Sequence, residues 1–246
     1  MIDLLLFLVA AWAGAQNALA GGGSFLILPT LMFAGMDARA ANITSCVALF
    51  PAQLATGWTG RALASGANGL SLGILFAISI VGGAIGAVIL LVTPPAFFAQ
   101  LVPWLVLFAT SIFAWGSFFR KPGGPERHLG AKGAALMQFL ISIYGGYFGG
   151  GIGFLMVAAL TLAGQNVRVA SATKNVLAGI MNAAAVAIFV FSPDLHWRQA
   201  LMTSAGAIIG GVLGAKLLHH VEEKYLRIFV VTIGVLLTAG LFYKAS

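Results

Sequence analysis

Apolar residues run along the chain in long stretches that short polar segments separate. These stretches cover about 2–34, 42–59, 70–92, 97–119, 133–163, 169–191, 197–218 and 225–243. Most contain about 18 to 23 residues, which is the length that an α-helix needs to cross roughly 30 Å of hydrocarbon. The pattern therefore predicts an all-α polytopic membrane protein.

Two of the stretches, 2–34 and 133–163, are too long for one ordinary crossing. As continuous helices they would extend roughly 45 to 50 Å at about 1.5 Å per residue. Both contain a glycine cluster: Gly21-Gly22-Gly23-Ser24 in the first and Gly145-Gly146-Tyr147-Phe148-Gly149-Gly150-Gly151-Ile152-Gly153 in the second. We therefore expect a broken helix in each stretch, either re-entrant or discontinuous.

The two clusters belong to an internal repeat. At an offset of 129, the segment from position 21 to position 44 aligns with the second half without a gap, and ten of its positions are identical. At an offset of 128, Gly82-Gly83 and Gly86-Ala87 match Gly210-Gly211 and Gly214-Ala215. The sequence thus predicts one transmembrane domain, 1–246, made of two homologous halves, about 1–119 and 133–246, joined by a polar linker, 120–132. Each half holds one broken helix followed by three transmembrane helices.

Lysine and arginine residues indicate how the halves are oriented. If each broken helix crosses once, the 13 basic residues divide seven against six; if each returns to its own side, they divide ten against three. Because basic residues gather in cytoplasmic loops, the second arrangement is favoured, with Arg39, Arg198 and Lys244 on the minority side. An odd number of crossings per half then predicts inverted repeats with both termini outside, a plan that secondary transporters often use.

Composition excludes several function classes. Hydrophobic residues make up 60% of the chain and charged residues 8%, so the net charge of +7 reflects membrane topology and not nucleic-acid binding. The sequence holds no nucleophile and base at motif spacing, no phosphate-binding Walker pattern and no cluster of metal ligands. We therefore expect neither an enzyme nor a resident metal or cofactor, and the lipid bilayer is the expected environment.

The broken helices supply the candidate chemistry. Unwound backbone at membrane depth survives only inside protein or beside a water-filled cavity, and a helix that restarts there points free N–H groups and a positive dipole end at the break. The candidate substrate-binding residues at the breaks are Gly21, Gly22, Gly23 and Ser24, a candidate helix cap, and Gly149, Gly150 and Gly151. The alternative is that the glycines only allow close helix packing.

Polar residues near the breaks extend the candidate site. They are Asn17 before the first break, Asn42 and Thr44 in the following stretch, and Lys174, Asn175 and Asn182 in the second half. An ionisable residue at membrane depth is a functional hypothesis, although Lys174 could also extend to the interface. Its repeat counterpart, Ser45, is neutral, so a cationic site would be asymmetric. The amides, including Gln53, could instead tie helices together, and Arg39 and Arg168 are interpreted as interface anchors.

The stretch Ala18-Leu19-Ala20-Gly21-Gly22-Gly23-Ser24-Phe25-Leu26-Ile27-Leu28-Pro29, continuing through Ala41-Asn42-Ile43-Thr44 to Pro51, resembles the TauE/SafE sulfite-exporter family of membrane permeases. Gly145 to Leu155 and Thr173-Lys174-Asn175 resemble it as well. The resemblance implies transport of sulfite, sulfoacetate or other organosulfonates across the bacterial inner membrane without ATP. It maps the family's glycine motif to residues 21–23 and 149–151. The proline that commonly follows is Pro29 in the first half but Ala158 in the second.

Together these observations predict a secondary transporter for small sulfur-containing anions that works by alternating access. An anion channel built from re-entrant glycine loops and a non-transporting membrane scaffold are the alternatives. The sequence leaves open the substrate, the coupling ion and whether the protein forms a homo-oligomer.

Overall fold

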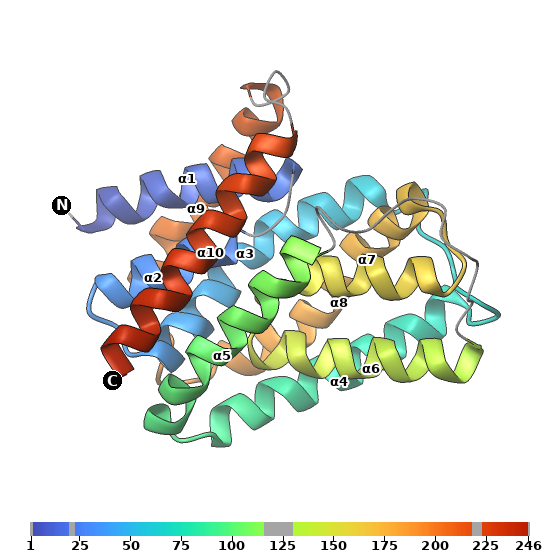
Figure 1. The fold of residues 1–246 in the computed structure, drawn as a ribbon, viewed down its shortest axis with the longest axis horizontal. Coiled ribbons are helices and arrows are strands. Elements are labelled where there is room, and N and C mark those ends of the chain that lie inside the picture. Colours follow the sequence, from blue (N-terminus) through green and yellow to red (C-terminus); the bar gives the residue numbers. More distant parts are fainter. Residues whose placement is uncertain (1, 20–22, 116–129, 218–222, 246) are drawn as a thin grey trace.

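The computed structural model describes residues 2–19, 23–115, 130–217 and 223–245. In these ranges the chain forms ten helices and no strand (Figure 1). The first five are α1 (Ile2–Leu19), α2 (Ser24–Phe33), α3 (Ala38–Gly60), α4 (Leu72–Val92) and α5 (Pro95–Ala114). The second five are α6 (Ala131–Tyr147), α7 (Ile152–Leu162), α8 (Val167–Phe189), α9 (Trp197–Leu217) and α10 (Glu223–Ala245). The all-helical fold is confirmed, and residues 120–129 of the expected linker lie outside the described ranges.

Both overlong apolar stretches are divided in two, α1 from α2 and α6 from α7. The start of α1 and the turn after α2 lie at the same end of the molecule. There Asp3 pairs with Arg198 of α9 at 2.5 Å, and Arg39 pairs with Asp194, in the loop just before α9, at 2.6 Å. The chain therefore enters along α1 and returns along α2. We call this the termini end, because α10 also finishes there (Figure 1).

Each broken helix packs on a helix of the other half of the chain. α1 lies against α9, α6 lies against α4, α3 crosses α8, and α5 pairs with α10. Glycine makes two of these contacts close. A Cβ added to Gly210 in α9 would lie 1.8 Å from the Ala11 carbonyl oxygen in α1, and one added to Gly86 in α4 would lie 2.2 Å from the Ile143 oxygen in α6. No side chain fits at either position, so these glycines serve packing.

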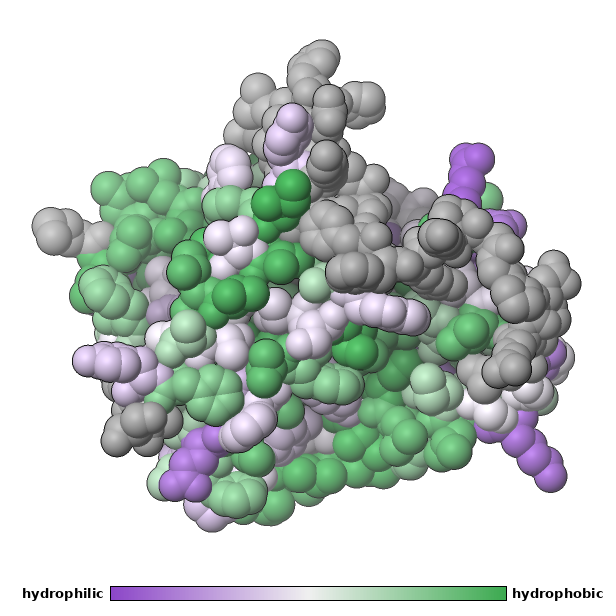
Figure 2. Space-filling view, viewed as in Figure 1, coloured by the Kyte–Doolittle hydropathy of each residue, from purple (hydrophilic) through white to green (hydrophobic). Residues whose placement is uncertain are grey.

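Large apolar side chains cover the outside of the molecule. Figure 2 shows hydrophobic residues over much of the visible face, and Val92, Leu201 and Leu236 are each more than 60% exposed. Among the described residues, three helices are long and apolar enough to cross a membrane: Leu72–Val92, Pro95–Ala114 and Val167–Phe189. An apolar exterior of this kind suits lipid, because water would not solvate it.

We expect Gly210→Ala to lower the free energy of unfolding by about 1–3 kcal/mol, because its methyl group must push the α1 backbone away. Gly211→Ala is the matched control, since its new Cβ would lie 3.8 Å from the Gly14 oxygen, an ordinary contact. Thermal unfolding in detergent compares the two variants. Equal stability of both would contradict the close contact between α1 and α9.

Candidate functional site

The second break consists of residues 148–151, between α6 and α7. Gly149 and Gly151 have φ angles of +76° and +74°, in the left-handed region that favours glycine, and Gly151 is the N-cap of α7. Gly145 and Gly146 serve differently. They lie inside α6, where an added Cβ would collide with Met181 or Gly83. The glycine cluster therefore divides into a packing pair and a turn that reverses the chain.

The first break is described only in part. Gly23 is buried and is the N-cap of α2, with φ −56° and ψ −30°. Ser24 is the first residue of that helix and not its cap, so the expectation of a Ser24 cap is wrong. Gly21, Gly22 and the side chain of Asn17 lie outside the described residues.

Lys174 extends from α8 to the first turn of α7. A Cβ built on Gly153 would lie 3.6 Å from Cδ of Lys174 and 3.8 Å from its Nζ. The side chain is mostly buried, and it makes no hydrogen bond or ion pair with any residue that the structure describes. The first N–H groups of a helix also have no partner within the helix. An ammonium and a positive helix end therefore lie together beside the second break, an arrangement that attracts an anion.

A second group of polar side chains lies where α3 crosses α8. The Asn182 side-chain amide donates a hydrogen bond to the Gln53 Oε1 atom, and the Cys46 thiol lies 3.9 Å from the Asn182 oxygen. Asn175 lies seven residues before Asn182 on α8, and its backbone oxygen would be 3.2 Å from a Cβ added to Gly57 in α3. Gln53 and Asn182 are separated by the repeat offset, so they are repeat counterparts that meet. This pairing was predictable from the sequence, because the offset of 129 that aligns the glycine clusters also aligns Gln53 with Asn182.

Asn42 and Thr44 are buried and bonded to other segments. The Asn42 amide donates to the Tyr147 carbonyl oxygen at 3.0 Å, at the end of α6, and so lies beside the second break. The Thr44 hydroxyl accepts from the His196 backbone N–H at 3.2 Å, near the termini end. The structure thus brings Asn42, Lys174 and residues 149–151 together at the second break, whereas Thr44 lies apart from them.

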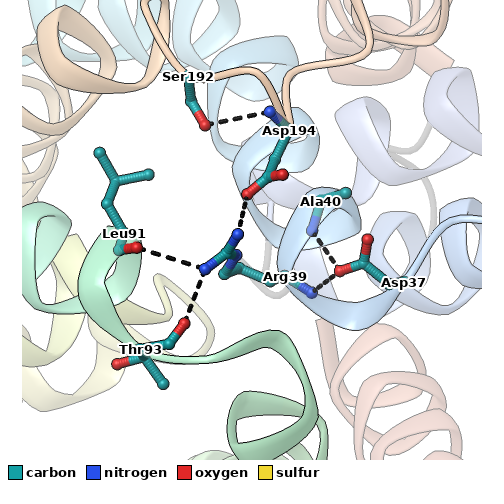
Figure 3. A network of polar contacts seen from close by, with 7 residues as sticks. All are labelled: Asp37, Arg39, Ala40, Leu91, Thr93, Ser192 and Asp194. Carbon is teal, nitrogen blue, oxygen red and sulfur yellow. Dashed lines mark hydrogen bonds and ion pairs between the residues drawn. The ribbon is translucent and has the colours of Figure 1, made fainter.

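Arg39 lies inside a polar network at the termini end (Figure 3). Its guanidinium pairs with Asp194 at 2.6 Å and donates to the carbonyl oxygens of Thr93 at 2.8 Å and Leu91 at 3.3 Å, where α4 ends. Its repeat counterpart, Arg168, is exposed. Arg39 therefore ties α3, α4 and the loop after α8 together, a contact more specific than the interface anchor that its position suggests.

No group of three or more His, Cys, Asp or Glu residues that could hold a metal ion occurs in the described part of the chain. The polar groups described around the second break are the Lys174 ammonium, the first N–H groups of α7 and side-chain amides such as that of Asn42. These groups recognise negative or hydrogen-bond-accepting atoms and hold no nucleophile beside a base.

The sequence profile described as "Sulfite exporter TauE/SafE" matches residues 6–241, and thus both breaks and all ten helices in whole or part. The chain belongs to the TauE/SafE family. A probable membrane transporter protein of Haemophilus influenzae is 30% identical, over 98% of this chain and 96% of its own length. The probable membrane transporter protein YfcA of Escherichia coli K12 is 27% identical, over 98% and 90%, and ORF9 of Sinorhizobium sp, also named a probable membrane transporter, is 26% identical over 96% and 90%. No solved structure matches.

Family membership and the helical, apolar structure make this TauE/SafE protein a membrane transporter.

We expect Gly151→Ala to destabilise this TauE/SafE protein by about 1–2 kcal/mol or more, because a left-handed backbone is unfavourable for alanine. The φ angle of Gly151 is +74°, and the new methyl would also lie 2.8 Å from the Ala109 side chain in α5. Gly153→Ala, two positions along, is the control, because its Cβ meets the Lys174 side chain at ordinary contact distances. Thermal unfolding of the purified variants checks the difference; a stable Gly151→Ala would show that the break tolerates a side chain.

Proposed function

We propose that this protein is a secondary transporter that moves small sulfur-containing anions, such as sulfite, sulfoacetate or other organosulfonates, across the bacterial inner membrane. The observation that carries the proposal is the Lys174 ammonium, unpaired among the described residues and lying at the N-terminus of α7. The family's description as a sulfite exporter supports the choice of cargo. An anion between the ammonium and the helix end would satisfy both.

The proposed substrate site lies between the two breaks. At the second break, Gly149, Gly150 and Gly151 form the turn that leads into the N-terminus of α7 beside Lys174, and Asn42 holds the end of α6 next to this turn. Asn175 and Asn182 continue the polar path along the face of α8 that meets α3. We assign the other side of the site to the first break, with Asn17, Gly21, Gly22, Gly23 and Ser24, and we place Thr44 at its outer boundary.

Alternating access would come from motion of one repeat against the other. The packing pairs support two equivalent halves, 1–119 and 133–246. Exchanging the two sets of five helices turns the α1 and α9 pair into the α6 and α4 pair and leaves the α3–α8 and α5–α10 pairs unchanged. α6 begins, with α4, at the end opposite to the start of α1, which is the relation that inverted repeats require. In this proposal both termini face outside.

The charge of the site sets which anions fit best. Lys174 supplies one positive charge, and its repeat counterpart Ser45 is a buried neutral residue. In a site shielded from water, a charge without a partner costs several kcal/mol, so a singly charged anion is matched and a doubly charged one is not. Among the sulfur-containing anions, we therefore expect singly charged sulfonates and hydrogen sulfite to bind more tightly than sulfate or sulfoacetate, which carry two charges.

Methanesulfonate and sulfate test this directly, because both are tetrahedral at sulfur and differ mainly in charge. Methanesulfonate should raise the melting temperature of the purified protein and should be carried saturably into liposomes, whereas sulfate at the same concentration should do neither. Lys174→Met should weaken methanesulfonate binding about 10- to 100-fold, because a charge-assisted contact is lost. Lys132→Met, which removes an exposed lysine at the start of α6, is the control.

Three results would contradict parts of the proposal. Equal binding of both anions would refute the charge match, and normal methanesulfonate affinity in Lys174→Met would refute the site. Unitary currents in a planar bilayer would show that the protein is an anion channel and not a carrier. Broken helices that return to their own end are also compatible with a channel.

A further inference from the structure

Two connecting loops are held by threonines that are repeat counterparts. Thr44 in α3 and Thr173 in α8 are separated by the repeat offset, and both are fully buried. The Thr44 hydroxyl accepts from the His196 backbone N–H at 3.2 Å, in the loop between α8 and α9. The Thr173 hydroxyl accepts from the Ser65 backbone N–H at 3.1 Å, in the loop between α3 and α4. Each half of the chain thus holds the corresponding loop of the other half.

A second side chain reinforces each loop contact. The Gln165 amide, in the turn before α8, donates to the carbonyl oxygens of Ser65 at 2.9 Å and Gly66 at 3.0 Å. Arg39, in the first turn of α3, pairs with Asp194 at 2.6 Å (Figure 3). Ser65 and Asp194 are separated by the offset of 129 and lie in the corresponding loops of the two repeats. We call these two assemblies the Thr44 contact and the Thr173 contact.

The two contacts lie at opposite ends of the molecule. The Thr44 contact is at the termini end, because the loop that it holds leads into Arg198, which pairs with Asp3 at the start of α1. The Thr173 contact holds the loop that leads into the start of α4. α4 runs beside α6 in the same direction, with Ser79 bonded to Gln138 and Gly86 against Ile143, so both helices begin at the end away from the start of α1.

We propose that the two contacts are the gates of the transport pathway. Release of the Thr44 contact opens the pathway to the termini end, and release of the Thr173 contact opens it to the opposite end. Each contact joins the two halves, so any motion of one half against the other must stretch one of them. The bonds are few, and the loop residues that they hold, Ser65 and His196, are exposed, which suits a contact that breaks and forms again. This inference rests on the proposed function, since a gate presupposes a pathway.

Cys46 provides a reporter inside the molecule. It is the sole cysteine of the chain, it is mostly buried, and it lies on α3 beside Asn182 at the crossing with α8. The experiment measures the rate at which a membrane-impermeant thiol reagent modifies Cys46, added to one side at a time of vesicles of known orientation. No substrate is needed.

Thr44→Val should raise the labelling rate from the termini side about tenfold and leave the rate from the other side unchanged. The valine cannot accept the hydrogen bond from the His196 backbone N–H, so the loop is released more often. Thr173→Val should show the mirror result. Thr59→Val is the matched control, since the Thr59 hydroxyl bonds only to carbonyl oxygens of its own helix among the described residues. If a threonine variant fails to fold, Asp194→Asn and Gln165→Ala loosen the same two contacts.

Unchanged labelling in every folded variant, or an equal rise from both sides, would overturn the gates and leave the contacts as structural ties. The proposed function fails separately. One-sided labelling without methanesulfonate transport would refute the cargo and keep the gates, whereas methanesulfonate transport with unchanged labelling would keep the transporter and refute the gates.

Discussion

The two helix breaks are the constraint on which the rest of this structure depends. A chain that unwinds in hydrocarbon leaves backbone N–H and C=O groups without partners, so it must be enclosed by protein or face a water-filled space. Both halves take part in enclosing each break. α4 and α9 pack on α6 and α1 of the opposite half, whereas α8 and α3 pack on α7 and α2 of their own half. Glycines such as Gly86 and Gly210 let the backbones approach closely enough for this, because any Cβ there would meet a carbonyl oxygen.

Enclosure also gives the second break its electrostatic character. In water a lone ammonium and a helix N-terminus attract anions weakly, but away from water the same charges act over a lower dielectric and their effect grows. Lys174 reaches the first turn of α7 because α7 packs along α8 and because Gly153 leaves room above that turn. The packing beside the break and the positive charge next to it thus come from the same pair of helices, α7 and α8.

Much of the fold could be predicted from the sequence, because hydrophobic runs and glycine clusters are local signals. The breaks fall at the glycines, and α3 and α8 have the same length and begin at equivalent positions of the repeat, at Ala38 and Val167. The partners of polar side chains could not be predicted in the same way, since they depend on which loop reaches which helix. The sequence places Thr44 near a substrate site, whereas its hydroxyl accepts a hydrogen bond from the His196 backbone N–H. The sequence suggests that Arg39 is an interface anchor, whereas its guanidinium donates to the Thr93 carbonyl oxygen at the end of α4. Ser24 reads as a cap, whereas the chain gives that position to Gly23.

The positions at which the two halves agree differ in role from those at which they diverge. Thr44 and Thr173 are the same residue and make the same kind of contact, and Gln53 and Asn182 are both amides that meet at the crossing of α3 and α8. Lys174 faces the second break, whereas its counterpart Ser45 is neutral, and Arg39 is paired where Arg168 is exposed. The proposed motion between two equivalent arrangements needs matched contacts in both halves, whereas the proposed site for one anion needs only one cation. Because the Lys174 side chain bonds to no described residue, its divergence from Ser45 leaves the matched contacts intact and gives the proposed site its positive charge.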